Sequence, residues 1–142
     1  MNYILVIIIA FFFQINQDTS LLQGKWKLET YDAFLIVQLS EQYKMGSDKQ
    51  KEEMDKVFNF TLDNTYFEFK GDTIIMDDAV NNKVERKVGI YHVEDDKITI
   101  NRIGKIHSKE YRLISVSEYE LVLALSYSDG QKDIHATFRR VN

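Results

Sequence analysis

The chain has 142 residues, with 44% hydrophobic and 13% aromatic residues, no cysteine, no proline and a formal net charge of −4 at pH 7. Without cysteine it has no disulfides, the usual reinforcement of small secreted domains, and no site for the lipid-modified cysteine that anchors bacterial lipoproteins. An acidic, charge-mixed chain also lacks the basic face that nucleic-acid phosphates require, so we expect no nucleic-acid partner.

Residues 1–17 form an uncharged segment around an unbroken apolar run from Ile4 to Phe13. This length is typical of a signal-peptide core. As a helix the run would span about 15 Å, about half of a ~30 Å hydrocarbon core. We therefore expect a cleavable signal peptide over residues 1–17, and a secreted or periplasmic mature domain over residues 18–142 with no stable membrane anchor. The alternative interpretation is an N-terminal strand or a buried helix.

A helical pattern follows a predicted first strand around Trp26, and it predicts a helical insert of about residues 32–57. Apolar residues near helical spacing predict a first helix over Phe34–Tyr43, which Gly46 ends. Ser47 and Gln50 form a predicted capping box for a second helix. The charge-rich face of that second helix is typical of a solvated surface.

From Phe58 onward, apolar residues alternate with polar ones, which is the period of half-buried strands. The alternating segments are Phe58 to Leu62, Phe67 to Phe69, Thr73 to Met76, Val84 to Val93, Lys97 to Asn101, His107 to Ile114, Glu118 to Tyr127 and Ile134 to Phe138. Polar turns separate them, at Asp77 to Asn82 and at Ser128-Asp129-Gly130 among other places. Successive hairpins form a meander, and closure removes its exposed edges. The predicted fold is mainly β: an antiparallel meander closing into an approximately eight-stranded barrel.

A Gly-x-Trp motif at Gly24 and Trp26 opens the mature domain on its first strand. This motif resembles the signature of lipocalins, especially of small bacterial lipocalin-like (calycin-type) domain proteins. The segment Gly89 to Val93 is similar to the Gly-x-Tyr-x-Val strand of those proteins. The resemblance implies that Gly24 lets the chain enter the barrel floor closely and that Trp26 plugs this floor.

The resemblance also implies that a basic residue of the last strand lies across the Trp26 ring, where cation–π attraction favours it. Arg139 and Arg140 are both candidates. We expect Arg140 to fill this role, because it shares the strand face of Phe138.

Two functional hypotheses follow for this barrel. An eight-stranded barrel is just wide enough to be filled by side chains or to hold one small ligand. The first hypothesis is an exported carrier of a small hydrophobic ligand, although the same rings can fill the barrel completely. The candidate ligand-binding residues are Phe60, Phe67, Phe69, Tyr91, Tyr111, Leu113, Leu121 and Leu123. The second hypothesis is a cell-envelope protein-interaction module with a filled barrel, in which the Phe34–Tyr43 helix contacts a partner or, alternatively, plugs the barrel mouth.

Motifs of catalysis and of metal binding are missing from the sequence. His92, His107 and His135 have no metal-ligand spacing, so we expect no metal and no cofactor. The sequence contains no Gly-x-Ser-x-Gly elbow and no phosphate-binding glycine loop. The carboxylate pairs Asp77-Asp78 and Asp95-Asp96 fall in predicted surface turns, where burial does not tune a pKa. We therefore expect a protein that is not an enzyme.

Overall fold

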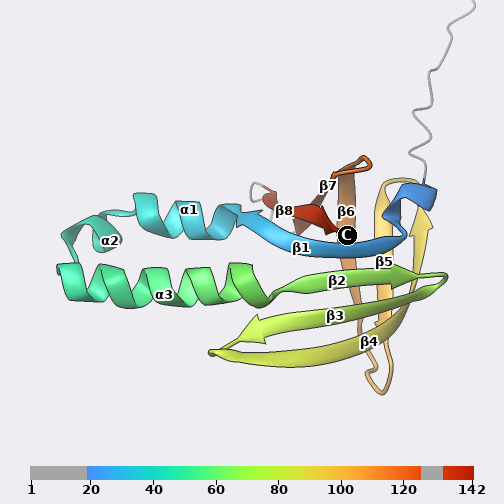
Figure 1. Cartoon of the computed structure of the whole chain (residues 1–142), viewed down its shortest axis with the longest axis horizontal. Coiled ribbons are helices and arrows are strands. Elements are labelled where there is room, and N and C mark those ends of the chain that lie inside the picture. Colours follow the sequence, from blue (N-terminus) through green and yellow to red (C-terminus); the bar gives the residue numbers. More distant parts are fainter. Residues whose placement is uncertain (1–18, 126–132) are drawn as a thin grey trace, which may run out of the picture.

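Eight strands pair in sequence order, and the last strand returns to pair with the first (Figure 1). The computed structural model describes residues 19–125 and 133–142. In chain order its elements are η1 (Thr19–Leu22), β1 (Gly24–Tyr31), α1 (Asp32–Leu39), α2 (Glu41–Met45), α3 (Asp48–Asn64), β2 (Tyr66–Lys70), β3 (Thr73–Val80), β4 (Lys83–Glu94), β5 (Lys97–Arg102), β6 (Ser108–Val116), β7 (Glu120–Leu125) and β8 (Ile134–Val141). The expected signal peptide and the turn at Ser128-Asp129-Gly130 lie outside the described residues.

The predicted fold class is confirmed: the strands form a closed antiparallel barrel with a helical insert after the first strand. Strand β1 closes the barrel against β8, with Trp26 opposite Arg140 and Leu28 opposite Phe138. Closure leaves none of these strands with an unpaired edge. Among residues 19–125 and 133–142, no helix is both long and apolar enough to span a bilayer.

Side chains at alternate positions of every strand form one hydrophobic core inside the barrel, because successive strand residues point to opposite faces. Its fully buried members include Trp26, Phe69, Ile74, Ile98, Ile100, Leu113, Leu121 and Leu123. Leu22 of η1 joins this core from the floor end. The buried side chains of the strands are therefore mostly the apolar ones of the alternating segments predicted from the sequence.

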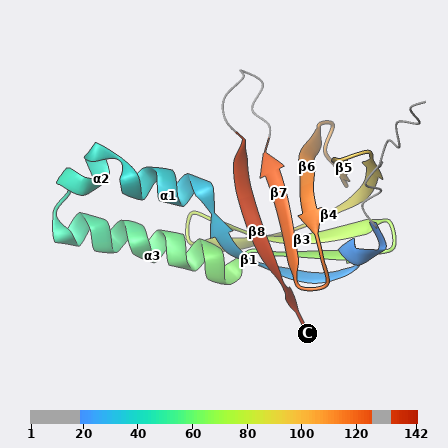
Figure 2. The same ribbon diagram turned by 90° about the horizontal axis from the view of Figure 1, so that it is seen from above.

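Helices α1, α2 and α3 form a helical hairpin that extends away from one end of the barrel, in line with β1 and β2 (Figures 1 and 2). Stacking of Phe34 on Phe58, with ring centroids 4.2 Å apart, joins α1 to α3. The Tyr43 hydroxyl donates to both carboxylate oxygens of Asp55, at 2.8 and 3.0 Å. The predicted capping box is confirmed, since Ser47 and Gln50 exchange both bonds at the start of α3.

The predicted end of the insert at Val57 was wrong, because α3 continues to Asn64. The predicted strand Phe58 to Leu62 is therefore the last part of this helix. Phe58 and Leu62 are four residues apart, a spacing that fits one helix face as well as one strand face. Phe58 stacks on α1 and Leu62 packs against the barrel core, so tertiary contacts decide between the two periods.

The expected single helix over Phe34–Tyr43 is divided in two, because α1 ends at Leu39 and α2 begins at Glu41. Ser40 lies between them in an extended conformation, and its hydroxyl accepts a bond from the Tyr43 amide. A serine hydroxyl is a good N-cap, which favours a new helix start over continuation.

The predicted turn over Asp77 to Asn82 was also wrong, because β3 runs to Val80 and the turn consists of Asn81 and Asn82. Both aspartates are paired within the sheet. Asp77 receives two hydrogen bonds from Arg86, which lies directly opposite it, and Asp78 accepts one from Lys87. The Arg86 hydrogen bonds hold the pKa of Asp77 below its ordinary value. Cross-strand cations thus allow acidic residues within a strand.

Candidate functional site

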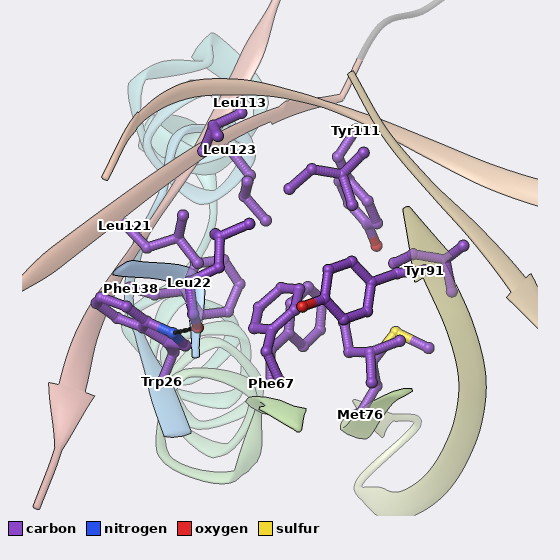
Figure 3. Close-up of a cluster of buried hydrophobic side chains, with 14 of the residues drawn as sticks. Leu22, Trp26, Phe67, Met76, Tyr91, Tyr111, Leu113, Leu121, Leu123 and Phe138 are labelled. Carbon is purple, nitrogen blue, oxygen red and sulfur yellow. Dashed lines mark hydrogen bonds between the residues drawn. The ribbon is translucent and has the colours of Figure 1, made fainter. Parts of the chain in front are cut away.

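The floor of the barrel is sealed around Trp26, which is fully buried and donates its indole N–H to the Leu22 carbonyl at 2.8 Å (Figure 3). The guanidinium carbon of Arg140 lies 4.1 Å from the centre of the Trp26 ring. Arg139 points away from it and pairs with Glu29 at 2.8 Å. Arg140 is therefore the residue that covers the tryptophan, as the sequence resemblance implied.

Gly24 provides the close approach that this floor needs. Its φ is +118°, a conformation that residues with a side chain rarely adopt. A Cβ at this position would also lie 2.6 Å from Nη1 of Arg140. Both the backbone conformation and the position of the arginine therefore require glycine.

A cavity of about 160 Å³ lies between the core and the end of the barrel from which the helical hairpin extends. Its apolar lining comes from six of the eight strands, all but β4 and β5. It consists of Leu28, Phe67, Met76, Tyr111, Leu125, Ala136 and Phe138, with Tyr31 at the start of the hairpin. In Figure 3, Phe67, Met76 and Tyr111 project inward from different strands. The volume is close to that of a ~150 Å³ apolar cavity that takes up benzene, so there is room for one ring.

Two hydroxyl groups line this cavity without a hydrogen-bond partner among the described residues. Thr65 is 6% exposed, and its Oγ1 is a buried polar atom that no described residue satisfies. The Tyr111 hydroxyl also makes no hydrogen bond within the described part of the chain. Burial, and to a smaller extent the Asp78 carboxylate, raises the pKa of Tyr111, so its hydroxyl remains protonated and can donate. Buried polar groups usually have partners, which makes the Thr65 hydroxyl unusual.

The eight predicted ligand-binding residues divide between three places. Phe67 and Tyr111 line the cavity. Phe69, Tyr91, Leu113, Leu121 and Leu123 are buried in the packed half of the barrel and are not part of the cavity lining. Phe60 lies on α3, half-buried, because its segment is helical. The barrel is thus filled at its floor end and hollow toward its mouth, which combines the two sequence-based alternatives.

Tyr91 illustrates why the floor half is filled. Its hydroxyl donates to the Gly71 carbonyl at 2.7 Å and accepts from Gln23 Nε2 at 2.7 Å. Its ring meets Phe69 edge-on at 4.9 Å between centroids. Burial raises its pKa. The Tyr91 hydroxyl is therefore fully used in hydrogen bonds at the barrel floor and is not available to a ligand.

The polar part of the cavity was not predicted from the sequence; it consists of Thr61, Thr65, Asp78, Lys87, Arg102 and Lys109. The strand alternation contains a signal for three of them, since Lys87 is in phase with Gly89 and Tyr91 on β4. Arg102 is in phase with Ile98 and Ile100 on β5, and Lys109 is in phase with Tyr111 and Leu113 on β6. A charged residue at an inward position of a strand indicates where the buried core ends and the barrel mouth begins.

The sequence led us to expect neither a metal site nor a catalytic site, and the residues considered for them lie as follows. No group of three or more His, Asp or Glu residues in the described ranges could hold a metal ion. His92 and His107 are exposed, and His135 is half-exposed on β8. Asp95 and Asp96 form the exposed β4–β5 turn, as predicted.

The helical hairpin does not plug the barrel mouth. Leu35, Ile36 and Leu39 of α1 are 52%, 59% and 68% exposed. Helices that are apolar on all sides are normally buried, so exposure of α1 is unusual. Three apolar residues of the predicted Phe34–Tyr43 helix therefore lie on the surface of the hairpin.

Comparison with known structures shows the same fold. A lipocalin-like protein from Bacteroides uniformis matches 85% of this chain and 99% of its own, with a TM-score of 0.53 and 16% sequence identity. An uncharacterized protein from Bacteroides eggerthii matches 84% of this chain and 99% of its own, with a TM-score of 0.51 and 14% identity. No protein-family model matches the sequence, and no curated protein matches it. The chain therefore has a lipocalin-like fold.

Proposed function

We propose that this lipocalin-like barrel is an exported binding protein that holds one small, largely apolar molecule in the cavity at its mouth. The observation that carries the proposal is a largely apolar cavity of about 160 Å³, lined by Phe67 and Tyr111 among other residues, in which the Tyr111 hydroxyl has no hydrogen-bond partner among the described residues. Binding sites are typically apolar, with a few polar groups that fix orientation. The uncharged apolar segment at residues 1–17 supports export.

The expected affinity for a single-ring probe is modest. One buried ring removes about 150–250 Å² from water, worth about 4–6 kcal/mol at 25 cal/mol per Å². Losses of translational and rotational freedom offset part of this gain. A probe such as 3-phenylpropanol should therefore bind with a Kd of about 1 mM.

The proposal is tested by expressing the full sequence in a bacterial host and recovering the periplasmic fraction. The intact mass of the product should correspond to removal of about the first 17 residues, and its native mass spectrum should contain a releasable small molecule. Titration of the emptied protein with 3-phenylpropanol should shift NMR signals of cavity residues such as Thr65 and Ala136.

Ala136→Leu provides the filled-cavity variant, because Ala136 lines the cavity and is 8% exposed. It should fold and lose probe binding. Leu123→Met is the matched control, since it conserves volume in the packed half and should leave binding unchanged. Unshifted cavity signals in the unsubstituted protein, or binding that survives Ala136→Leu, would reject the cavity as the ligand site. A full-length product retained in the cytoplasm would reject export.

The second candidate function is a protein-interaction module, and the exposed apolar surface of α1 favours it. Asp32 is the only charged residue of α1, so two such helices can pack together without burying unpaired charges. The occupant we assign to this surface is a second copy of the chain, because symmetric dimers are the commonest assemblies.

Self-association is measured by sedimentation velocity at about 10–100 µM, the range in which weak dimers form. We expect a concentration-dependent dimer that the double substitution Leu35→Ser and Ile36→Ser abolishes. Ile106→Ser is the control, because Ile106 is 97% exposed but lies in the β5–β6 turn. A monomer throughout this range, or a dimer that survives the double substitution, would contradict the assignment.

A further inference from the structure

Four charged residues occupy inward positions at the barrel mouth, one on each of four consecutive strands. Asp78 of β3, Lys87 of β4, Arg102 of β5 and Lys109 of β6 all line the cavity. The register explains how they meet: Lys87 lies opposite Met76, Arg102 opposite Gly89, and Lys109 opposite Ile100. Deeper inward positions on the same strands are apolar, as at Ile74, Ile98 and Leu113. The charges therefore form a rim above an apolar floor.

Positive charge dominates this rim. Lys87 is paired with Asp78, with 2.6 Å between Nζ and Oδ2, so these two charges largely offset each other. Arg102 is half-buried, and it has no acidic partner among residues 19–125 and 133–142. Lys109 makes a cation–π contact with the Tyr111 ring at 5.0 Å, but it likewise has no carboxylate partner in the described ranges. Two basic groups thus remain unpaired beside the cavity.

Hydrogen-bond donors in the cavity, like the unpaired positive charges, favour a ligand that carries an acceptor. The raised pKa of Tyr111 keeps its hydroxyl protonated, so it can donate to an acceptor. Guanidinium and ammonium groups can only donate. The Tyr111 hydroxyl and the two unpaired cations, Arg102 and Lys109, are therefore the donors that the cavity and its rim offer to a ligand.

We propose that the ligand is a small amphipathic carboxylate, with an apolar body the size of about one ring in the cavity and its carboxylate at Arg102 and Lys109. This inference rests on the proposed binding function and names the chemical class of its ligand. A guanidinium matches a carboxylate with two parallel hydrogen bonds, and such charge-assisted bonds are stronger than neutral ones. The apolar cavity excludes the charge, so the carboxylate stays at the rim.

The test compares two probes that share the same apolar part, 3-phenylpropionate and 3-phenylpropanol, by NMR titration of the purified full-length or processed protein. The carboxylate should bind about tenfold more tightly than the alcohol, as expected for one charged hydrogen-bonding contact. Raising the salt concentration should weaken the binding of the carboxylate much more than that of the alcohol, because salt screens partly exposed charges.

Arg102→Gln and Lys109→Gln should each reduce the preference for the carboxylate, and the double variant should abolish it while the alcohol still binds. Lys105→Gln is the matched control, since it removes the same charge from the neighbouring turn but does not line the cavity. Equal binding of both probes would overturn the carboxylate assignment and leave the proposed binding function standing. If neither probe binds, the binding function itself fails. If Lys105→Gln also abolishes the preference for the carboxylate, the effect comes from the overall charge of the protein. That result would overturn the proposed contact with Arg102 and Lys109.

Discussion

Replacing Trp26 by alanine should lower the free energy of unfolding by about 4 kcal/mol or more, because truncating a buried large aromatic side chain typically costs 3–5 kcal/mol. The substitution also removes the partner of the Leu22 carbonyl and the ring beneath the Arg140 guanidinium. Domains of this kind are stable by only about 5–15 kcal/mol. The melting temperature should therefore fall by at least about 10 °C.

Urea unfolding followed by far-UV circular dichroism measures this effect, because Trp26 is the only tryptophan of the chain and fluorescence is lost with it. Trp26→Phe should give an intermediate loss, since it keeps an aromatic ring but removes the N–H donor. Tyr119→Ala is the control: its side chain is 71% exposed, and its loss should change stability by less than about 0.5 kcal/mol. A Trp26→Ala variant as stable as this control would show that the floor does not depend on the plug.

Replacing Arg140 by alanine should cost about 2–4 kcal/mol, the second largest effect that we expect. Its guanidinium donates to the backbone carbonyls of Leu21, Gln23 and Glu118 at 2.5–2.6 Å, besides covering Trp26. These bonds join β8 to the segment before β1 and to the β6–β7 turn. Because the Arg140 guanidinium is partly exposed to water, the expected loss in the free energy of unfolding is smaller than the sum of three charged hydrogen bonds.

Arg139→Ala is the matched control on the same strand. Arg139 forms an exposed ion pair with Glu29, with side chains 62% and 41% exposed, and such pairs contribute less than about 1 kcal/mol. Arg140→Lys should fall between the two, because an ammonium cannot reproduce the planar, multiply donating contact. Equal losses for Arg139→Ala and Arg140→Ala in urea unfolding would contradict this division of roles.

Local patterns were sufficient wherever a residue's environment depends on its near neighbours in the chain. Alternation of apolar residues predicted most of the strands, since one face of each strand had to be buried. The capping box at Ser47 and Gln50 was also readable, because all of its bonds lie within one helical turn. The Gly24-x-Trp26 motif, through its resemblance to lipocalins, indicated both the floor and its covering arginine.

Misassigned segments are those in which two interpretations satisfied the same local pattern. Phe58 and Leu62 fit a strand face and a helix face equally, and only packing against Phe34 and the barrel core favours the helix. Asp77 and Asp78 look like turn residues in isolation. Their place within β3 depends on Arg86 and Lys87, which a different strand supplies.

The sequence by itself therefore determined a cysteine-free meander of short strands, closed at its floor by Trp26 and Arg140, with a helical insert after the first strand. Only the tertiary structure decided that the barrel is packed at the floor and hollow at the mouth. The reason is that a cavity is the space left between side chains from strands far apart in sequence, so no single segment encodes it. The same holds for the rim, where strands β3 to β6 each contribute one charge, and only barrel closure brings these charges around one opening.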